Sequence, residues 1–514
     1  MDFVDTTASS FSSSQDAQLL LRNVTLLSQS EACGLLFGQD LLIAGPRIQA
    51  VGPTGTLLPQ PGAALTSKDC DGLLLLPGLI NAHTHSPENV LKATSPSLPL
   101  ELWLVPLFAG MEEWTPRLVY LSALLGAMEM LKAGTTAVLD HLWTPDGVAY
   151  PYLDAAMQAY YDVGIRAAVA PSIEDQDLVQ EAALARGLSW PEHPFIDRFA
   201  AWPPVEEQLE HLERFFASWH LADRGRLRGL AAPSGIHWCS PALLDACLAI
   251  AERHQTGIHL HAVETELQAH VIREALGQGG IAALQARGYL RAGTSLAHTI
   301  WLEEGDLERL AGSGATVVHN PVSNLRLGSG RFPFVEARRQ GVSVALGSDG
   351  SASNDTQNMF GVLKLTGLLH NYPQTPYQSW PGPVDILEAA TLGGAAALGL
   401  GNELGRVAPG QLADLALYDL KTSAFLPLRD PYLHLIYCET GTSVKTVIVN
   451  GRIVVEDGRI CRVDEEEVRK EIRERCATVW PGWPAQRDRI ARTAEVQATF
   501  EALWRLLLRG EKKI

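Results

Sequence analysis

Eight short apolar runs that alternate with amphipathic stretches predict an α/β protein, a TIM (β/α)8 barrel of parallel strands. The runs cover residues 73–85, 135–141, 165–171, 227–234, 257–264, 294–300, 315–323 and 342–350. Amphipathic stretches at 118–132, 241–254 and 303–311 are the expected helices between them. No glycine-rich phosphate turn follows the first run, which disfavours the alternative of a doubly wound open sheet.

Two β-rich segments flank the barrel and predict a small composite β-sandwich domain, with two separate caps as the alternative. Residues 19–75 form its first part and residues 401–463 its second, so the metal-dependent TIM barrel covers residues 76–400. Residues 1–18 are Ser-rich and acidic and are expected to be a mobile tail. Residues 464–514 form a helical C-terminal extension, whose apolar stripe should pack on the barrel or on a second subunit. The stripe consists of Phe500, Leu503, Leu506 and Leu507.

Composition excludes several classes of partner. The net charge of -17 and a pI near 5.4 argue against nucleic acid, which binds clustered Lys and Arg. Neither a signal peptide nor an apolar run of about 20 residues is found, so no membrane contact is expected. Seven scattered cysteines without a CxxC pair indicate reduced thiols and a cytoplasmic protein. The expected partner is a small molecule.

Polar side chains end several of the apolar runs, in a pattern that predicts a metal site. His83 and His85 are two residues apart, so a strand directs both imidazoles to the same face. His261 ends the fifth run and Asp349 the eighth, which a closed barrel places beside the first. An HxH pair alone is more often accidental. Together, however, three histidines and an aspartate are suited to one divalent ion, Zn²⁺ or alternatively Fe²⁺.

Seven segments carry a family resemblance in register over residues 19–462. They are PGLINAHTH, HLHAVET, SLAHTIWL, VVHNPVSNLRLGSG, LGSDGSASND, GRVAPGQLADLALYDL and VIVNGRIVVEDG. These segments resemble the amidohydrolase superfamily, in its branch of triazine hydrolases and of purine, pterin and adenosylhomocysteine deaminases. The resemblance implies the barrel with its composite domain. It also implies a mononuclear metal on His83, His85, His261 and Asp349, and a catalytic pair of Glu264 and His298.

The absence of lysine between Lys132 and Lys364 favours one metal ion over two. Binuclear relatives bridge their ions with a carboxylated lysine from the middle of the barrel, which this chain cannot supply there. A bridging Glu or Cys is not formally excluded, although none stands at the end of the fourth run.

The expected chemistry is attack of metal-activated water on an electrophilic ring carbon. Asp349 accepts the proton of the water while it binds the metal, and Glu264 protonates the ring nitrogen and then the leaving amine. His298 orients the water or helps to deprotonate it. Without the metal pattern, Glu264 would be interpreted as a solvated carboxylate at a helix start and His298 as a core histidine.

The resemblance also indicates residues that shape the substrate pocket. His319 and Asn320 begin the polar turn that follows the seventh strand, and Glu101 and Trp103 match a segment that covers the site. Trp103 is expected to stack on a planar ring, with core packing as an equal alternative. One departure concerns Ser234, because many deaminases of this branch have a histidine after the proline at this position. This departure argues against an adenosylhomocysteine-like substrate.

The sequence therefore predicts a hydrolytic deaminase of an amino-substituted N-heterocycle. Hydrolysis of another C–N bond or of a C–Cl bond, including ring opening or closing, is an alternative within the enzymes. A non-catalytic scaffold is the alternative outside them, although a scaffold has no need for a costly buried polar cluster. A homodimer is expected by analogy.

Overall fold

The structure, a computed structural model, describes residues 17–27, 34–109, 114–144, 148–188, 202–479 and 494–508. The predicted mobile tail lies outside the described residues except for Ala17 and Gln18. Gln18, the last residue of the predicted tail, already belongs to the first strand.

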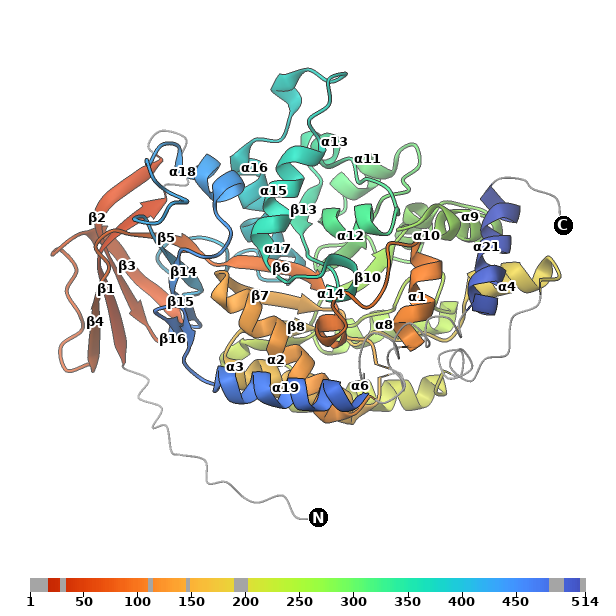
Figure 1. Cartoon of the computed structure of the whole chain (residues 1–514), viewed down its shortest axis with the longest axis horizontal. Coiled ribbons are helices and arrows are strands. Elements are labelled where there is room, and N and C mark those ends of the chain that lie inside the picture. Colours follow the sequence, from red (N-terminus) through yellow and green to blue (C-terminus); the bar gives the residue numbers. More distant parts are fainter. Residues whose placement is uncertain are drawn as a thin grey trace, which may run out of the picture.

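Strands from both ends of the chain share one nine-stranded sheet, which lies at one end of the molecule (Figure 1). The sheet order is β17-β16-β15-β14-β5-β1-β2-β3, and β4 pairs with β1. Different halves of β1 pair with β4 and β5, so hydrogen bonds connect all strands of the expected sandwich into one branched sheet. The strands are β1 (Gln18–Leu27), β2 (Leu35–Ala44), β3 (Arg47–Pro53), β4 (Leu65–Asp69), β5 (Leu73–Pro77), β14 (Leu415–Asp419), β15 (Val444–Val449), β16 (Arg452–Glu456) and β17 (Arg459–Ile460).

The central block contains two four-stranded parallel sheets, ordered β6-β7-β8-β9 and β10-β11-β12-β13. All eight predicted runs contain one of these strands, but the first run is divided. Its residues 73–77 form β5 of the composite sheet, and only the part after Gly78 enters the central block. The strands are β6 (Leu79–Thr84), β7 (Thr135–Asp140), β8 (Arg166–Val169), β9 (Leu227–Gly229), β10 (Ile258–Ala262), β11 (Thr294–His298), β12 (Thr316–His319) and β13 (Ser343–Leu346).

Backbone hydrogen bonds join the two sheets at both of their seams. Between β9 and β10, the His259 N–H donates to Ala231 O at 2.9 Å and the His261 N–H to Ser234 O at 3.1 Å. Between β13 and β6, the Asp349 N–H donates to His83 O at 2.9 Å. The described strands thus form two half-sheets that meet twice, although they do not form one continuous eight-stranded ladder.

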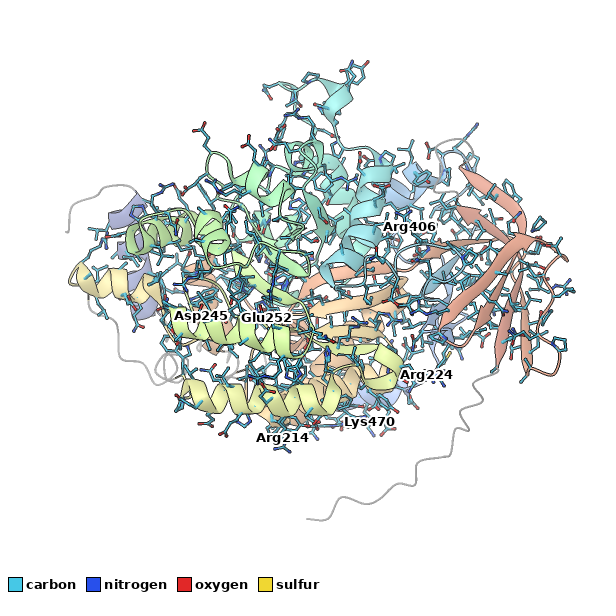
Figure 2. The ribbon with its side chains drawn as sticks, turned by 180° about the vertical axis from the view of Figure 1, so that it is seen from behind. Arg214, Arg224, Asp245, Glu252, Arg406 and Lys470 are labelled. Carbon is cyan, nitrogen blue, oxygen red and sulfur yellow. The ribbon has the colours of Figure 1, made fainter. Side chains whose placement is uncertain are left out.

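Helices cover the outside of these strands and bury their apolar faces. The predicted stretches at 118–132, 241–254 and 303–311 correspond to α2, α8 and α11. In the view from behind, Asp245 and Glu252 of α8 and Lys470 of α19 mark the solvent side (Figure 2). The main covering helices are α2 (Pro116–Lys132), α3 (Tyr150–Val163), α6 (Val205–Trp219), α8 (Pro241–Arg253), α9 (Glu266–Leu276), α10 (Gly280–Ala286), α11 (Asp306–Ala311) and α15 (Met359–Leu369). No helix among the described residues is both long enough and apolar enough to span a bilayer.

The C-terminal extension packs on the same chain at two places. Helix α19 (Glu465–Val479) lies along α2, where Lys132 Nζ is 2.8 Å from Glu465 Oε2. Helix α21 (Ala494–Leu508) packs on α9 and α4 (Leu178–Ala185) through an apolar cluster centred on buried Leu503. Phe500 belongs to this cluster, and α21 lies at the end of the molecule opposite the composite sheet (Figure 1).

A buried ion pair ties the composite sheet to the central strands. Arg166 in β8 donates from Nε to Asp414 Oδ2 at 2.6 Å and from Nη2 to Asp414 Oδ1 at 2.9 Å. Asp414 directly precedes β14, and Asn450 also contacts both partners. Because both charged groups are excluded from water, each depends on the other for compensation.

We expect Arg166→Ala and Asp414→Ala each to lower the free energy of unfolding by about 3–5 kcal/mol, because each leaves one charge buried without its partner. The double variant should lose less than the sum of the two. Denaturant unfolding of the three variants measures this coupling, and strictly additive losses would contradict it.

Candidate metal centre and catalytic cavity

Four side chains predicted to bind metal converge at the carboxyl ends of the central strands. His83 lies in β6, His85 directly follows it, His261 lies in β10 and Asp349 follows β13. Asp349 Oδ1 is 3.3 Å from Nε2 of both His83 and His85. His261 Nε2 is 3.4 Å from His85 Nε2. One carboxylate and three imidazoles thus lie close together. Two groups of ligand atoms that could hold an ion include His83, one with His141 and His261 and the other with His298 and Asp349.

Hydrogen bonds on the far side of each ring orient the three imidazoles. His85 Nδ1 is 2.6 Å from His141 O, and His261 Nδ1 is 2.8 Å from Ser234 O. A carbonyl only accepts, so both Nδ1 atoms carry the proton and both Nε2 atoms keep a free lone pair. Burial lowers the pKa of His83 to about 4 and lowers that of His261 well below its usual value. Neutral imidazoles are the form that binds metal.

The donor set fits one divalent cation. His83 Nε2 is buried and has no hydrogen-bond partner among the described residues, which calls for a ligand because buried polar atoms are rarely unpaired. Zinc–ligand bonds of about 2.0–2.1 Å in a tetrahedral arrangement separate the ligand atoms by roughly 3.4 Å. The observed separations of 3.3 and 3.4 Å agree with this size.

Asp349 is held by the seam between β13 and β6. Its backbone has a φ of +62°, an unfavourable conformation for a non-glycine residue that surrounding contacts must maintain. The Asp349 carbonyl accepts from Thr84 Oγ1 at 3.1 Å and from Gln357 Nε2 at 3.2 Å. Gly347 allows the close approach, because a Cβ there would lie 2.9 Å from His83 Cβ. Closure of the two half-sheets therefore aims the carboxylate.

The predicted catalytic pair lies beside this cluster. His298 Nε2 is 3.6 Å from Glu264 Oε2 and 3.9 Å from Asp349 Oδ2. His298 Nδ1 is 2.8 Å from Asn324 Oδ1, which we assign as an N–H donated to the amide oxygen. Burial, together with the nearby charges of Asp349 and Glu101, raises the pKa of Glu264 well above its usual value. Burial thus favours the protonated form of the Glu264 carboxyl, which is the form that can donate a proton.

Three further histidines were not singled out by the sequence analysis. Buried His259 lies behind the cluster, with Nε2 at 2.8 Å from His83 Nδ1 and Nδ1 at 2.7 Å from Ser295 Oγ. His141 follows β7, and its ligand atoms lie within 4.8 Å of those of His83 and His261. His237 lines the cavity described next. His141 ends an apolar run as His83 does, so the same signal could have identified it.

A cavity of about 670 Å³ opens onto the cluster, a size typical of small-molecule sites. Its lining includes Glu264, His298 and Asp349, and also Glu101 and Trp103, as predicted for substrate contact. Glu101 and Trp103 belong to α1 (Leu100–Ala109), and Thr265 Oγ1 donates to Glu101 Oε1 at 2.5 Å. A planar substrate can therefore meet both the cluster and the α1 side chains.

His319 and Asn320, the other two predicted substrate contacts, are not among the described residues that line the cavity. The His319 ring lies between Phe332, Phe334 and His370, with ring centroids 5.5–6.0 Å apart. Asn320 Nδ2 is 3.5 Å from His298 Nδ1. Asn320 thus approaches the site through His298, whereas His319 is part of a buried aromatic cluster.

The comparisons with known proteins agree with this geometry. The sequence profile of the amidohydrolase family matches residues 74–454. The chain belongs to the amidohydrolase family. It is 30% identical over 460 residues to a 5-methylthioadenosine/S-adenosylhomocysteine deaminase of Pelotomaculum thermopropionicum, covering 89% of this chain and 98% of the relative. It is 30% identical over 458 residues to a 5'-deoxyadenosine deaminase of Methanosarcina mazei, covering 88% and 96%.

Two solved structures of related proteins contain zinc. An atrazine chlorohydrolase from Arthrobacter aurescens TC1 superposes with a TM-score of 0.78 at 26% identity, covering 89% of this chain and 99% of its own. An adenosine deaminase from Xanthomonas campestris superposes with a TM-score of 0.76 at 25% identity, covering 93% and 99%. The predicted enzyme class, a hydrolase of carbon–nitrogen bonds in a metal-dependent family, is confirmed.

Buried His370, beside His319, gives a pH-dependent prediction. Burial and then Arg331 lower the pKa of His370 to about 4, below its usual 6.5. As the pH falls from 6.5 towards 4, His370 becomes protonated in the unfolded chain but stays neutral in the folded chain. The free energy of unfolding therefore decreases. For metal-free protein taken from pH 7.5 to 5.5, His370→Gln should lose about 1 kcal/mol less free energy of unfolding than wild type. His270→Gln, at an exposed position, should behave like wild type; equal losses in all three proteins would contradict the prediction.

Proposed function

We propose that this protein hydrolytically removes an amino group from a nitrogen-rich heterocycle. The observation that carries the proposal is the position of buried Glu264, whose Oε2 lies 3.6 Å from His298 Nε2 in the cavity that opens onto the His83, His85, His261 and Asp349 cluster. Loss of ammonia requires a proton for the leaving amine, and Glu264 is placed to supply one. Deaminases of adenosine-like compounds among the relatives support the same reaction.

We propose that the four ligands hold a single Zn²⁺, with Fe²⁺ as the alternative. Three imidazole nitrogens and one carboxylate oxygen suit either ion. Zinc in both solved relatives favours the first. When bound, the cation supplies the Lewis acidity that acidifies water near neutral pH.

The side chains around the cluster divide the proton transfers between them. Asp349 Oδ2 faces His298 Nε2 at 3.9 Å, so this pair can take the proton of the attacking water and hold the water in place. Glu264 protonates the ring nitrogen of the substrate as the ring carbon becomes tetrahedral. The proton that the Asp349–His298 pair has taken then passes to Glu264, which protonates the departing amine, and the hydroxyl proton released as the carbonyl forms returns Glu264 to its protonated state.

Hydrolysis of another C–N bond or of a C–Cl bond is the second candidate, because a chlorohydrolase is among the similar structures. Halide needs no proton to leave, so a buried acid is less useful there. A non-catalytic scaffold is disfavoured, because the buried polar cluster and its hydrogen bonds are costly to retain without catalysis.

We also propose that the central strands form a closed barrel and that the two β-rich segments form one composite domain. The two seams support closure into a (β/α)8 barrel over residues 76–400. The nine-stranded sheet supports a composite domain built from residues 19–75 and 401–463, with residues 464–514 as an extension. A homodimer stays a prediction, which sedimentation of the purified protein would test.

Ammonia release from a panel of aminopurines, aminotriazines, pterins and aminopyrimidines, with metal content measured in parallel, tests the function directly. We expect close to one zinc per chain and ammonia from at least one aminoheterocycle. A metal-free, inert protein would favour the scaffold, and chloride release without ammonia would favour the second candidate.

Asp349→Ala should abolish turnover and lower the bound metal, because it removes one of four ligands and the partner of His298. Asp245→Ala, on the exposed face of α8, is the control and should keep both. Metal analysis and ammonia assays on the same preparations check this. Full metal retention by Asp349→Ala would show that the carboxylate is not a ligand.

Glu264→Gln should keep the metal but lower kcat for deamination by about 10²–10⁴-fold, the usual contribution of a general acid. Glu266→Gln, exposed two residues further along, is the matched control. If Glu264→Gln retained wild-type kcat on an amino substrate, the proton-transfer role would be wrong.

A further inference from the structure

The cavity has a large apolar wall in addition to the catalytic cluster. Six aromatic side chains other than histidine line it: Trp103, Phe108, Trp143, Trp202, Trp238 and Phe500. Phe108 and Trp143 meet edge to face with ring centroids 5.3 Å apart. An adenine-sized ring covers only part of such a wall, so the remaining surface is available to a substituent on the ring.

No lysine or arginine is among the described residues that line this cavity. The acidic groups of the wall beyond the cluster are the carboxyls of Glu88, Glu101, Glu174, Asp177 and Glu207. Burial raises the pKa of Glu88 and of Asp177 to about 7, and it also raises the pKa of Glu174. Burial in the wall therefore disfavours the ionised form of its own carboxyls, and a ligand anion finds no lysine or arginine among the described lining residues to pair with.

We infer that the substrate carries an uncharged, mostly apolar substituent on its amino-heterocycle, and that substituents bearing a carboxylate or phosphate are rejected. This inference rests on the proposed deamination and narrows its substrate class. It separates the named substrates of the relatives, because a methylthio group is neutral whereas a homocysteine group carries a carboxylate as well as an ammonium, and the described lining offers that carboxylate no lysine or arginine.

The C-terminal extension completes the apolar wall. Phe500 comes from α21, which lies beyond the residues 74–454 matched by the family. Buried Leu503, one turn further along the helix, packs with Val179, Leu267 and Val271 of the body and so fixes the position of Phe500. Phe500 is therefore a specificity residue that the extension adds to the cavity.

The charge preference can be tested with two adenosine analogues that differ only at the 5' carbon, one with a methylthio group and one with a carboxymethylthio group. We expect kcat/KM to be at least about tenfold higher for the neutral analogue. Equal or better use of the carboxylate would overturn the inference. Binding of both analogues to the zinc-loaded Glu264→Gln variant, measured by calorimetry, reports the preference without turnover. Weaker binding of the carboxylate analogue, together with no ammonia from any aminoheterocycle of the panel with the wild-type enzyme, would support the inference and contradict the proposed function.

A charge reversal at the cavity wall sharpens the test. Glu207→Lys places a cation at an exposed position that lines the cavity, whereas Glu206→Lys makes the same change on α6 outside the described lining. Relative to wild type, Glu207→Lys should improve the carboxylate-to-neutral ratio of kcat/KM about fivefold. Glu206→Lys should leave the ratio unchanged. The same ratio in both variants would contradict a charge effect inside the cavity.

The role of α21 is tested by Phe500→Ala, with exposed Glu501→Ala as the control on the same helix. Loss of the ring should raise KM for the methylthio analogue about tenfold and change kcat little, because the contact lies away from the reacting carbon. Phe500→Leu should recover most of the loss. If Phe500→Ala left both the KM and the unfolding temperature unchanged, Phe500 would not contact the substrate.

Discussion

The meeting of strands β6 and β13 is the constraint on which the site depends. Through the hydrogen bond from Asp349 N–H to His83 O, residues more than 260 positions apart become neighbours. The Asp349 carboxylate then lies 3.3 Å from both imidazoles of the HxH pair. The positive φ of Asp349 is an energetic cost that the hydrogen bonds of Thr84 and Gln357 offset. Without this seam, the four ligands would not share a centre.

Burial sets the protonation states that the chemistry requires. The same exclusion from water lowers the pKa of His83 and His261 and raises that of Glu264, because it disfavours the charged form of each group. Neutral imidazoles provide lone pairs to a cation, and a protonated carboxyl provides a proton to a leaving amine. One physical effect thus prepares both the metal site and the acid.

The parts of the chain outside the central strands also serve the site. The buried Arg166–Asp414 ion pair connects the composite sheet to the central strands. Arg166 is the first residue of β8, so this pair lies at the end of the strand opposite the predicted metal ligands. The extension packs back on the same chain and places Phe500 in the cavity wall. The cavity wall that would surround a substrate thus comes from segments far apart in sequence. No single segment explains why the described lining contains no lysine or arginine.

The sequence by itself determined the strand order, the family and the identity of the residues that converge, because short apolar runs that end near His83, His261 and Asp349 are local signals. It also indicated that Glu101 and Trp103 cover the site. The tertiary structure alone decided that residues 73–77 leave the central block for the composite sheet, because their apolar pattern suits a buried strand in either place. It also placed His319 among aromatic rings instead of in the cavity, since a histidine after a strand can turn either way. The position of His259 behind His83 and that of Phe500 in the cavity wall could not be predicted for a similar reason. Each position depends on contacts between distant segments, and such contacts produce no pattern in the sequence.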